Sequence, residues 1–341
     1  LGPREALIRA VAVLIITCPC ALGLAVPAVQ ITASARLFRK GVLVKSGAAL
    51  ERMAEVSHVI FDKTGVLTEG RPRLIDPAPA LVAMAAPLAR ASRHPLSRAL
   101  ASEAGDGPIA DEVTEHHGEG VEGIIDGRRA RLGRAGFLGL AGHRHGETEL
   151  WFGFDGDTPH RFGFSDRLRP DAAATIAALK ARGLTVEILS GDVPEAVRSV
   201  AEAVGIAHWR AAVLPFDKVA AVETLSGRGS RVLMVGDGLN DTAALAKAHA
   251  AMAPGSALDA SQNAADLVFT GDSLMAVLDA LDVARSARGR ALENFGFAAL
   301  YNAVAAPAAM LGLVNPFIAA LAMSGSSLIV TLNALRTGRT Q

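Results

Sequence analysis

Three short motifs that combine carboxylates, lysine or serine with glycine follow strand-like apolar runs far apart in the chain. They are Asp62-Lys63-Thr64-Gly65 after Val59-Ile60-Phe61, Ser190-Gly191-Asp192 after Val186-Glu187-Ile188-Leu189, and Gly236-Asp237-Gly238-Leu239-Asn240-Asp241 after Val232-Leu233-Met234-Val235. In an open parallel sheet, polar groups at the carboxyl ends of neighbouring strands meet at one crevice. The side chains expected to surround that crevice are those of Asp62, Ser190, Asp237 and Asp241, with Lys218 from a following helix beside them.

One lysine among three carboxylates and a hydroxyl suits a site that binds Mg²⁺ and a phosphoryl group. The ion takes hard oxygen ligands, the lysine offsets phosphate charge, and one carboxylate is free to attack phosphorus. Each motif alone is also typical of an ordinary turn between a strand and a helix, where Asp, Gly and Ser are common. The recurrence of the pattern at three strand ends, together with a lysine, favours the chemical interpretation.

The elements that must position these groups alternate between strand and helix from Arg161 onward. Helices are expected at about 171–182 and from Pro194, Pro215 and Asn240, and a further strand over 266–269. This alternation predicts a doubly wound α/β sheet with right-handed crossovers. The glycine-, charge- and histidine-rich stretch between the first and second motifs predicts a small inserted α+β domain.

Composition and hydropathy predict membrane-spanning helices in addition. Half of the 341 residues are hydrophobic, only 4% are aromatic, and the mean hydropathy is +0.31. Three stretches, 10–35, 295–314 and 317–335, contain no charged residue and are long enough to cross a bilayer. Basic residues flank all three on the side of the catalytic motifs, which the positive-inside rule assigns to the cytoplasm. We therefore expect a multi-pass protein of the cell membrane with cytoplasmic catalytic domains.

Cys18-Pro19-Cys20 interrupts the first of these stretches. Proline removes a backbone donor and breaks the helix, and broken backbone at membrane depth is tolerated only where protein covers it or it lines a cavity. Two thiols beside such a break suit a soft ion such as Cu(I). The alternative is a proline kink beside small buried hydrophobic residues; the paired cysteines favour the metal.

The strand-end motifs resemble the phosphorylation-domain motifs of the P-type ATPases, on the haloacid-dehalogenase fold, and the Cys-Pro-Cys triplet resembles the ion-binding signature of their heavy-metal branch. The resemblance implies that Asp62 is phosphorylated by ATP. It also implies a catalytic set of Asp62, Lys63, Thr64, Ser190 and Lys218, and Mg²⁺ ligands from Asp62, the Thr64 carbonyl, Asp237 and Asp241. Val66 departs from the family, which usually has a second threonine there.

Two features of the inserted stretch resemble the nucleotide domain of heavy-metal ATPases: Ser92-Arg93-His94-Pro95-Leu96 and Gly118-Glu119-Gly120. The resemblance implies that ATP is bound by His94, Gly118 and Gly120, with Gly191 and Asp192. His94 alone would more often be a structural histidine. The run from Gly118 to Gly123 also matches a dinucleotide fingerprint, but an Asp-Gly hairpin turn follows it rather than a helix, which excludes that interpretation. The family tends to have a glutamate where Ala89 stands, which predicts weaker ATP binding.

Polar residues inside the last two spans are costly and suggest function. Tyr301-Asn302, Met323 and Ser327 match the Tyr-Asn and Met-x-x-Ser-Ser patterns of copper ATPases, whereas Ser324 and Gly325 suit helix packing. The resemblance implies that Cu⁺, or Ag⁺, is bound by Cys18, Cys20, Tyr301, Asn302, Met323 and Ser327. Neutral and soft ligands favour Cu(I) over Zn²⁺.

The chain is therefore identified as the C-terminal portion of a copper-transporting P-type ATPase. The predicted limits are 1–40 for a transmembrane helix with Cys-Pro-Cys, 41–72 and 158–284 for the phosphorylation domain, 73–157 for the nucleotide domain, and 290–336 for two transmembrane helices. The expected partners are a copper ion, ATP, the lipid bilayer and a copper chaperone. Equal numbers of basic and acidic residues, 34 of each, give no argument for nucleic acid.

Two other functions remain open from the sequence. No Thr-Gly-Glu occurs in it, so we expect the actuator domain that hydrolyses the phosphoenzyme, and the earlier helices, to be missing. A membrane-tethered phosphatase of the dehalogenase type would need no Cys-Pro-Cys, and an inactive fragment would bind only nucleotide or metal. Transport direction and physiological role are also open, although the compact nucleotide domain is similar to the branch that supplies copper for cytochrome oxidase assembly.

Overall fold

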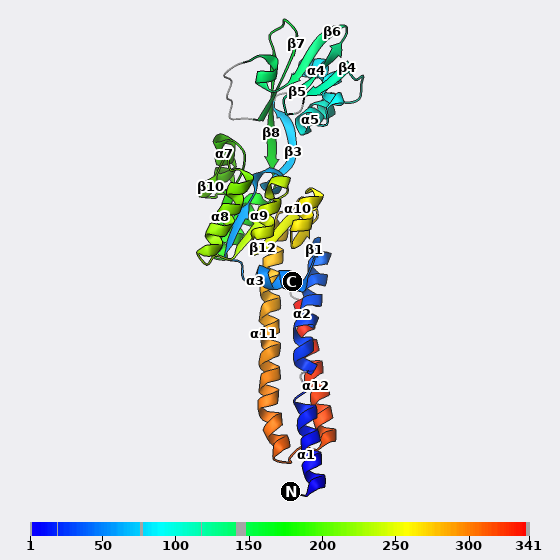
Figure 1. Cartoon of the computed structure of the whole chain (residues 1–341), viewed down its shortest axis with the longest axis vertical. Coiled ribbons are helices and arrows are strands. Elements are labelled where there is room, and N and C mark those ends of the chain that lie inside the picture. The colour runs from blue at the N-terminus through cyan, green and yellow to red at the C-terminus, as the bar shows by residue number, and fades with distance from the viewer. Residues whose placement is uncertain (1, 19, 76–77, 117, 141–147, 339–341) are drawn as a thin grey trace.

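The computed structural model describes the whole chain except residues 1, 19, 76–77, 117, 141–147 and 339–341. Figure 1 shows three parts in a row along the long axis: a β-rich domain, a central α/β domain, and a bundle of long helices that ends near the N-terminus. Strands β3 (Thr68–Ile75) and β8 (His160–Leu168) connect the first two parts. Helices α2 (Cys20–Arg39) and α11 (Met275–Met310) connect the central domain to the bundle.

The central domain is built on a seven-stranded sheet in the order β1-β13-β12-β11-β2-β9-β10. Its strands are β1 (Val42–Val44), β2 (His58–Phe61), β9 (Thr185–Leu189), β10 (His208–Arg210), β11 (Val232–Val235), β12 (Ala250–Pro254) and β13 (Leu267–Phe269). All neighbours pair in parallel except β1 and β13. Phe61 is level with both Val235 and Ile188, so the residues that follow β2, β9 and β11 emerge at one edge of the sheet.

Helices cover both faces of this sheet, because its buried strands are apolar on both sides. One core contains Phe61, Val235 and Phe269, and the other contains Ile60 and Met234. The helices are α3 (Gly47–Ala54), α6 (Ala172–Ala181), α7 (Pro194–Val204), α8 (Pro215–Gly227), α9 (Thr242–Lys247) and α10 (Asp259–Ala264). The predicted doubly wound α/β fold is confirmed. The sequence reading missed β1, β10 and β12, of which two are only three residues long.

The β-rich domain is an antiparallel sheet in the order β3-β8-β7-β6-β5-β4, inserted between β2 and β9. The other strands are β4 (Asp111–His116), β5 (Gly120–Ile125), β6 (Arg128–Gly133) and β7 (Thr148–Phe154). Helices α4 (Pro79–Ala91) and α5 (Pro95–Ala104) pack with this sheet around a core that includes Leu88, Leu100 and Phe152. The predicted Asp-Gly hairpin joins β5 to β6, with positive φ at both Asp126 and Gly127, as a type I′ turn requires. The inserted α+β domain is thus confirmed.

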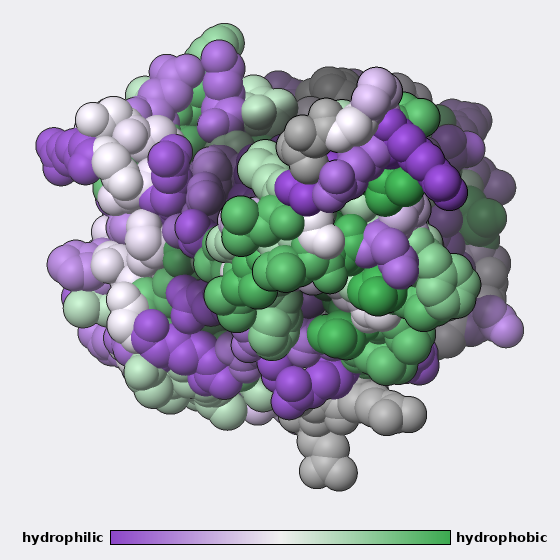
Figure 2. All heavy atoms as spheres, turned by 90° about the horizontal axis from the view of Figure 1, so that it is seen from below, coloured by the Kyte–Doolittle hydropathy of each residue, from purple (hydrophilic) through white to green (hydrophobic). Residues whose placement is uncertain are grey.

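The bundle consists of α1 (Pro3–Ile16), α2, the second half of α11, and α12 (Pro316–Leu335). Helix α1 ends at Ile16 and α2 begins at Cys20, so the helix is broken around the Cys-Pro-Cys triplet, of which Pro19 lies outside the described residues. Within the described ranges, one helical segment, Pro316–Gly338, is long and apolar enough to cross a membrane by the usual criteria. Seen from the bundle end, Figure 2 shows hydrophobic side chains gathered over the bundle and hydrophilic ones around it.

Helix α11 runs without a break for 36 residues from the central domain into the bundle. Its first turns pack in the core of the central domain through Val277, Leu278 and Leu281. The predicted limits at 284 and 290 therefore fall inside one helix, because an uncharged stretch marks apolar surroundings and not the end of a helix.

Candidate phosphorylation, nucleotide and metal sites

Asp62 lies at the end of β2, where the chain enters a tight loop. Its Oδ2 accepts a hydrogen bond from the backbone N–H of Thr64 at 3.0 Å. Gly65 has a φ of +71°, and a Cβ built there would lie 1.6 Å from Oδ2 of Asp237. Glycine is therefore required twice over, for the left-handed backbone and for the close approach of Asp237 to this loop.

Lys218 joins two of the carboxylates. Its Nζ lies 2.6 Å from Oδ1 of Asp62 and 2.6 Å from Oδ1 of Asp241, and all three side chains are at least nine-tenths buried. Helix α8 supplies the lysine, and a short 3₁₀ turn, Leu239–Asp241, supplies Asp241. The three residues come from three separate segments; Asp62 and Asp241 follow strands that end at one crevice, and Lys218 comes from a helix beside it.

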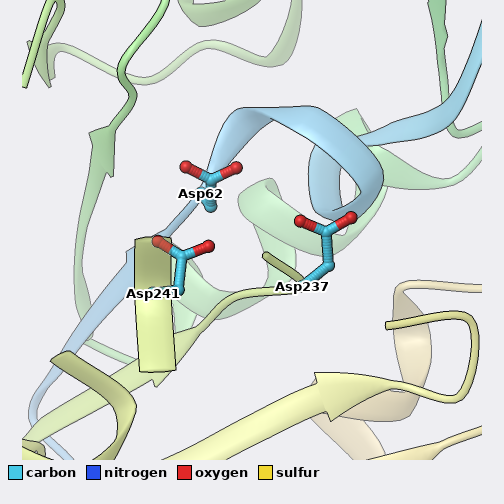
Figure 3. Close-up of side chains that lie close together, drawn as sticks. All are labelled: Asp62, Asp237 and Asp241. Carbon is cyan, nitrogen blue, oxygen red and sulfur yellow. The ribbon is translucent and has the colours of Figure 1, made fainter. Parts of the chain in front are cut away.

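Asp62, Asp237 and Asp241 form a potential metal centre (Figure 3). Each offers one oxygen, and these oxygens lie within 4.8 Å of one another. Figure 3 shows the Asp237 carboxylate directed towards the loop that follows Asp62, with Asp241 beside Asp62. Among the described residues, this is the one group of three or more His, Cys, Asp or Glu side chains close enough together to surround an ion. Hard oxygen donors at this spacing fit Mg²⁺.

The electrostatics of the cluster also fit a divalent cation. Burial raises the pKa of Asp62 to about 6, with a further rise from the Asp241 charge that Lys218 only partly offsets. Burial likewise raises the pKa of Asp237 to about 7, and the charges of Asp62 and Asp241 add to this. Burial lowers the pKa of Lys218, but the two carboxylates outweigh it and the net shift is upward. Three carboxylates with one lysine thus leave negative charge that a cation would balance.

The second motif is tied to the first through Lys63. Nζ of Lys63 lies 2.5 Å from Oδ2 of Asp192, and the lysine side chain is 8% exposed. Ser190 is buried, and its Oγ accepts a hydrogen bond from the backbone N–H of Asp192 at 3.2 Å. Lys63 and Asp192 were assigned to different roles from the sequence, and the structure places them in one ion pair.

Sequence reasoning missed a further buried charge beside the loop. Nε of Arg169 donates to the carbonyl of Val66 at 2.7 Å, and Nη2 donates to the carbonyl of Gly65 at 2.8 Å. Its side chain is 2% exposed. A charge just before the helix expected at about 171–182 is ordinary, and no motif marks Arg169 in the sequence.

The nucleotide-domain residues line a cavity of about 630 Å³ in the β-rich domain. Its lining includes Ser92, His94, Leu96, Glu115, Gly118, Gly120, Leu132 and Arg134. The size and the mixture of apolar and polar groups are typical of small-molecule sites. A Cβ at Gly120 would lie 2.5 Å from the carbonyl oxygen of Leu132, so this glycine is required by strand packing whether or not it contacts a ligand.

His94 is held in one orientation at the start of α5. Its Nδ1 accepts the backbone N–H of Leu96 at 3.3 Å, which leaves the proton of the neutral ring on Nε2. Burial and the charge of Arg134 lower the pKa of His94, which favours the neutral ring. Glu115, which the sequence reading missed, accepts from Oγ of Ser92 at 3.0 Å, and Ser92 Oγ accepts from the N–H of His94. Ala89 is fully buried in the domain core.

Comparison with known proteins gives a consistent family. Residues 56–249 match the haloacid dehalogenase-like hydrolase family. The nitrogen fixation protein FixI of Bradyrhizobium diazoefficiens is 49% identical over 98% of this chain and 47% of its own length. A copper-exporting P-type ATPase of Mycobacterium tuberculosis is 38% identical over 98% of this chain and 46% of its own. The chain belongs to the heavy-metal P-type ATPases.

Solved structures agree with this family assignment. The crystal structure of a zinc-transporting PIB-type ATPase matches with a TM-score of 0.77 and 32% identity, over 98% of this chain and 62% of the other. The catalytic CPx-ATPase domain CopB-B matches with a TM-score of 0.60 and 30% identity, over 74% of this chain and 98% of that domain. The resemblance stated from the motifs is confirmed. This heavy-metal ATPase chain spans about half the length of the curated relatives it matches.

The bundle of this P-type ATPase chain contains the predicted transport-metal residues. Cys18 is a free, half-buried cysteine; the side chain of Cys20 lies outside the described part. Tyr301 and Asn302 lie on α11, and Met323 and Ser327 lie half-buried on α12, which contacts α11. Among the described residues, the Tyr301 hydroxyl and Oδ1 of Asn302 are buried without a hydrogen-bond partner. Buried polar atoms are nearly always paired, so these two atoms fit a site completed by a ligand.

Proposed function

We propose that this chain is the catalytic and metal-binding part of an ATP-driven copper(I) transporter that works through an aspartyl-phosphate at Asp62. The observation that carries the proposal is the buried ion-pair cluster, in which Lys218 contacts both Asp62 and Asp241 while Asp237 lies against the loop after Asp62. Such a cluster supplies a nucleophilic carboxylate, a fixed cation for phosphate oxygens and a set of ligands for Mg²⁺.

In the proposed reaction a carboxylate oxygen of Asp62 attacks the γ-phosphorus of ATP. A bond forms between that oxygen and phosphorus, the bond from phosphorus to the bridging oxygen breaks, and ADP leaves with the electron pair. Lys218 offsets the charge of the phosphoryl oxygens, and the Thr64 N–H fixes the attacking carboxylate. Mg²⁺ held by Asp62, Asp237, Asp241 and the Thr64 carbonyl would neutralise phosphate charge and orient the transferred group.

ATP would bind in the 630 Å³ cavity, with His94 donating from Nε2 and Gly118 leaving room for the nucleotide. The cavity belongs to the β-rich domain and Asp62 to the central domain, and β3 and β8 connect the two. Phosphoryl transfer therefore requires these domains to approach each other by bending at the two strands. Gly191 and Asp192 would complete the nucleotide site once Asp192 is released from Lys63.

Copper is proposed as the transported metal because of the ligand chemistry. The predicted set contains thiols, a thioether and neutral oxygen or nitrogen groups, and the stretches 295–314 and 317–335 contain no carboxylate or lysine. Soft donors without charge select Cu(I), or Ag⁺ as its analogue, over Zn²⁺. One relative is a copper-exporting ATPase by name, and one solved neighbour is a zinc transporter.

We place the protein in a membrane, with several helices crossing it and the catalytic domains in the cytoplasm. The exposed apolar surface of the bundle and the basic residues at its catalytic end support this orientation. A copper chaperone as the donor of the ion rests on the family resemblance alone.

The decisive experiment measures acid-stable labelling of the purified chain from γ-labelled ATP and Mg²⁺, with and without Cu(I) or Ag⁺. Asp62→Asn should abolish labelling, and Asp126→Asn, in an exposed hairpin turn, should leave it intact. Replacing Cys18 and Cys20 together by serine should remove the metal dependence and keep the chain folded. If Asp62→Asn is labelled as strongly as the parent, the proposal is wrong. If labelling is the same with and without Cu(I) or Ag⁺, the phosphatase is favoured. Nucleotide binding without labelling favours the inactive fragment.

A further inference from the structure

Arg169 is bonded to three successive carbonyls of the phosphorylation loop. Its guanidinium donates to Gly65 and Val66, and its backbone N–H donates to the carbonyl of Leu67 at 2.9 Å. These carbonyls directly follow Thr64, in the loop whose other side Asp237 contacts. A buried guanidinium that lost these acceptors would carry a large desolvation penalty. The loop and Arg169 are therefore expected to move together.

Two residues further on, Asp171 is bonded to the beginning of α11. Its Oδ2 accepts from Oγ of Ser273 at 2.6 Å and from the backbone N–H of Met275 at 3.0 Å. Leu274, at the N-cap position of α11, has no side-chain acceptor, so Asp171 takes over the capping role from a distant segment. Burial would raise the pKa of Asp171, but the hydrogen bonds from Ser273 and from the backbone outweigh it and lower the pKa.

The two sets of bonds are joined by a stiff link. Pro170, between Arg169 and Asp171, fixes its own φ, which limits how far one can move without the other. On the helix side, Nη1 of Arg169 lies 3.9 Å from Oδ1 of Asp272, the residue before Ser273. Asp272 is 79% exposed, so this second connection is weak and the covalent link is the main one.

We propose that Arg169 and Asp171 form a positioning pair that couples the state of the Asp62 loop to the first turn of α11. This inference rests on the proposed function, because the change of state is phosphorylation of Asp62. Helix α11 is continuous to Met310 and carries Tyr301 and Asn302, so a displacement of its first turn reaches the proposed metal ligands. The pair thus provides a physical route between the phosphoryl and metal sites, built from contacts rather than proximity alone.

The test is hydrogen–deuterium exchange of the whole chain in detergent, with and without Mg²⁺ and beryllofluoride, an analogue of the phosphoryl group on a carboxylate. In the parent we expect exchange to change both in the loop, 63–68, and around the start of α11, 273–279. Asp171→Ala should keep the loop response and lose the helix response, and Asp171→Asn should retain part of it. Arg169→Gln should lose the helix response as well. A role in stability alone would change baseline exchange in α11 without removing the ligand-dependent difference.

Asp282→Ala provides the matched control, because Asp282 also attaches α11 to the central domain, through a bidentate pair with Arg182 that does not involve the loop. It should leave both responses intact. If Asp171→Ala does not fold, Ser273→Ala removes one of the two bonds and is expected to reduce the helix response. A full helix response in Ser273→Ala, Asp171→Ala or Arg169→Gln overturns the coupling, as does a parent that responds only in the loop. A parent without any response overturns the proposed function and, with it, this inference.

Discussion

The phosphorylation site and the bundle site differ in how far their buried polar groups are paired within the chain. Around Asp62 the buried charged side chains have partners within this chain: Lys218 lies between two carboxylates, and the Arg169 guanidinium donates to two carbonyls, although its Nη1 has no hydrogen-bond partner among the described residues. In the bundle, the Tyr301 hydroxyl and Oδ1 of Asn302 are buried without one among the described residues. The cluster around Asp62 is thus organised by side chains of this chain, whereas the proposed metal site in the bundle would need a ligand to pair its buried polar atoms. Substitutions at the Asp62 site should therefore lower both stability and catalysis, whereas substitutions at the bundle site should lower metal affinity.

The largest effect is expected for Lys218→Met. The change removes the cation that stabilises transferred phosphate charge, and losing one such group lowers rates by about 10²–10³-fold. It also leaves the carboxylates of Asp62 and Asp241 buried without their cation. Removing one partner of a buried ion pair lowers the free energy of unfolding by about 3–5 kcal/mol, because the remaining charge is uncompensated. The rate of phosphoenzyme formation and the thermal midpoint should both fall at neutral pH. Lys247→Met, at an exposed pair with Glu223, should change neither.

Magnesium binding should depend on pH through the same carboxylates. Asp62 and Asp237 have pKa values raised by burial to about 6 and about 7, so the ion must displace protons below neutrality. Apparent Mg²⁺ affinity should rise with pH, by about tenfold per unit for each proton released, and level off above pH 7. Calorimetric titrations at pH 6, 7 and 8 measure this, and an affinity that is flat over the range contradicts the raised pKa values.

The stability of the metal-free chain should show the opposite trend. An acid whose pKa is higher in the folded state than its ordinary value of 3.8 holds more protons when folded. Its favourable contribution is complete below about pH 4 and is lost as pH rises through about 7. Thermal midpoints without Mg²⁺ should thus decline across this window relative to Asp237→Asn, in which one of the two groups no longer titrates.

In the nucleotide cavity, a substitution at a residue that positions His94 should have a small effect on ATP affinity. Glu115 accepts from Ser92, which in turn accepts from the N–H of His94, so it positions the histidine without being buried. Glu115→Ala should weaken ATP binding by about 1 kcal/mol, roughly fivefold in Kd. Glu103→Ala, near the other end of α5, is the control and should bind ATP as the parent does. If the parent, Glu115→Ala and Glu103→Ala bind ATP with equal affinity, Glu115 has no role in the nucleotide site.

Much of the phosphorylation site was predictable because a parallel sheet turns sequence pattern into geometry. Three apolar runs that end in polar motifs become strands in register, and Phe61 lies level with Val235 and Ile188. Arg169 and Asp171 were not predictable, since most of their partners are backbone groups of distant segments, and backbone groups leave no pattern in the sequence. The antiparallel edge strand β1 was not predictable either, because three residues are too few to show alternation. The assigned roles of the metal and nucleotide residues stay predictions.

Two asparagines of the bundle, Asn333 and Asn302, should differ in their contribution to stability. The smallest effect is expected at Asn302. Asn333 donates to Oδ1 of Asn294 at 2.9 Å and to Oε2 of Glu293 at 3.1 Å, whereas Oδ1 of Asn302 has no partner among the described residues. Asn333→Ala should cost about 1–3 kcal/mol, because it leaves the buried Asn294 partly unpaired. Asn302→Ala removes an atom that is already unpaired, so the thermal midpoint should stay level or rise.

Adding Ag⁺ should reverse the order of these two variants. A ligand that binds only the folded state raises the thermal midpoint, and the rise grows with the logarithm of the ligand concentration divided by its Kd. Asn333→Ala should keep the silver-dependent rise of the parent, since its hydrogen bonds lie outside the proposed ligand set, while Asn302→Ala should lose much of it. If both asparagines prove equally important for stability and equally indifferent to silver, the unpaired oxygen of Asn302 is a packing detail. The bundle would then be held together by the same satisfied polar contacts as the phosphorylation site, and the contrast between the two sites would disappear.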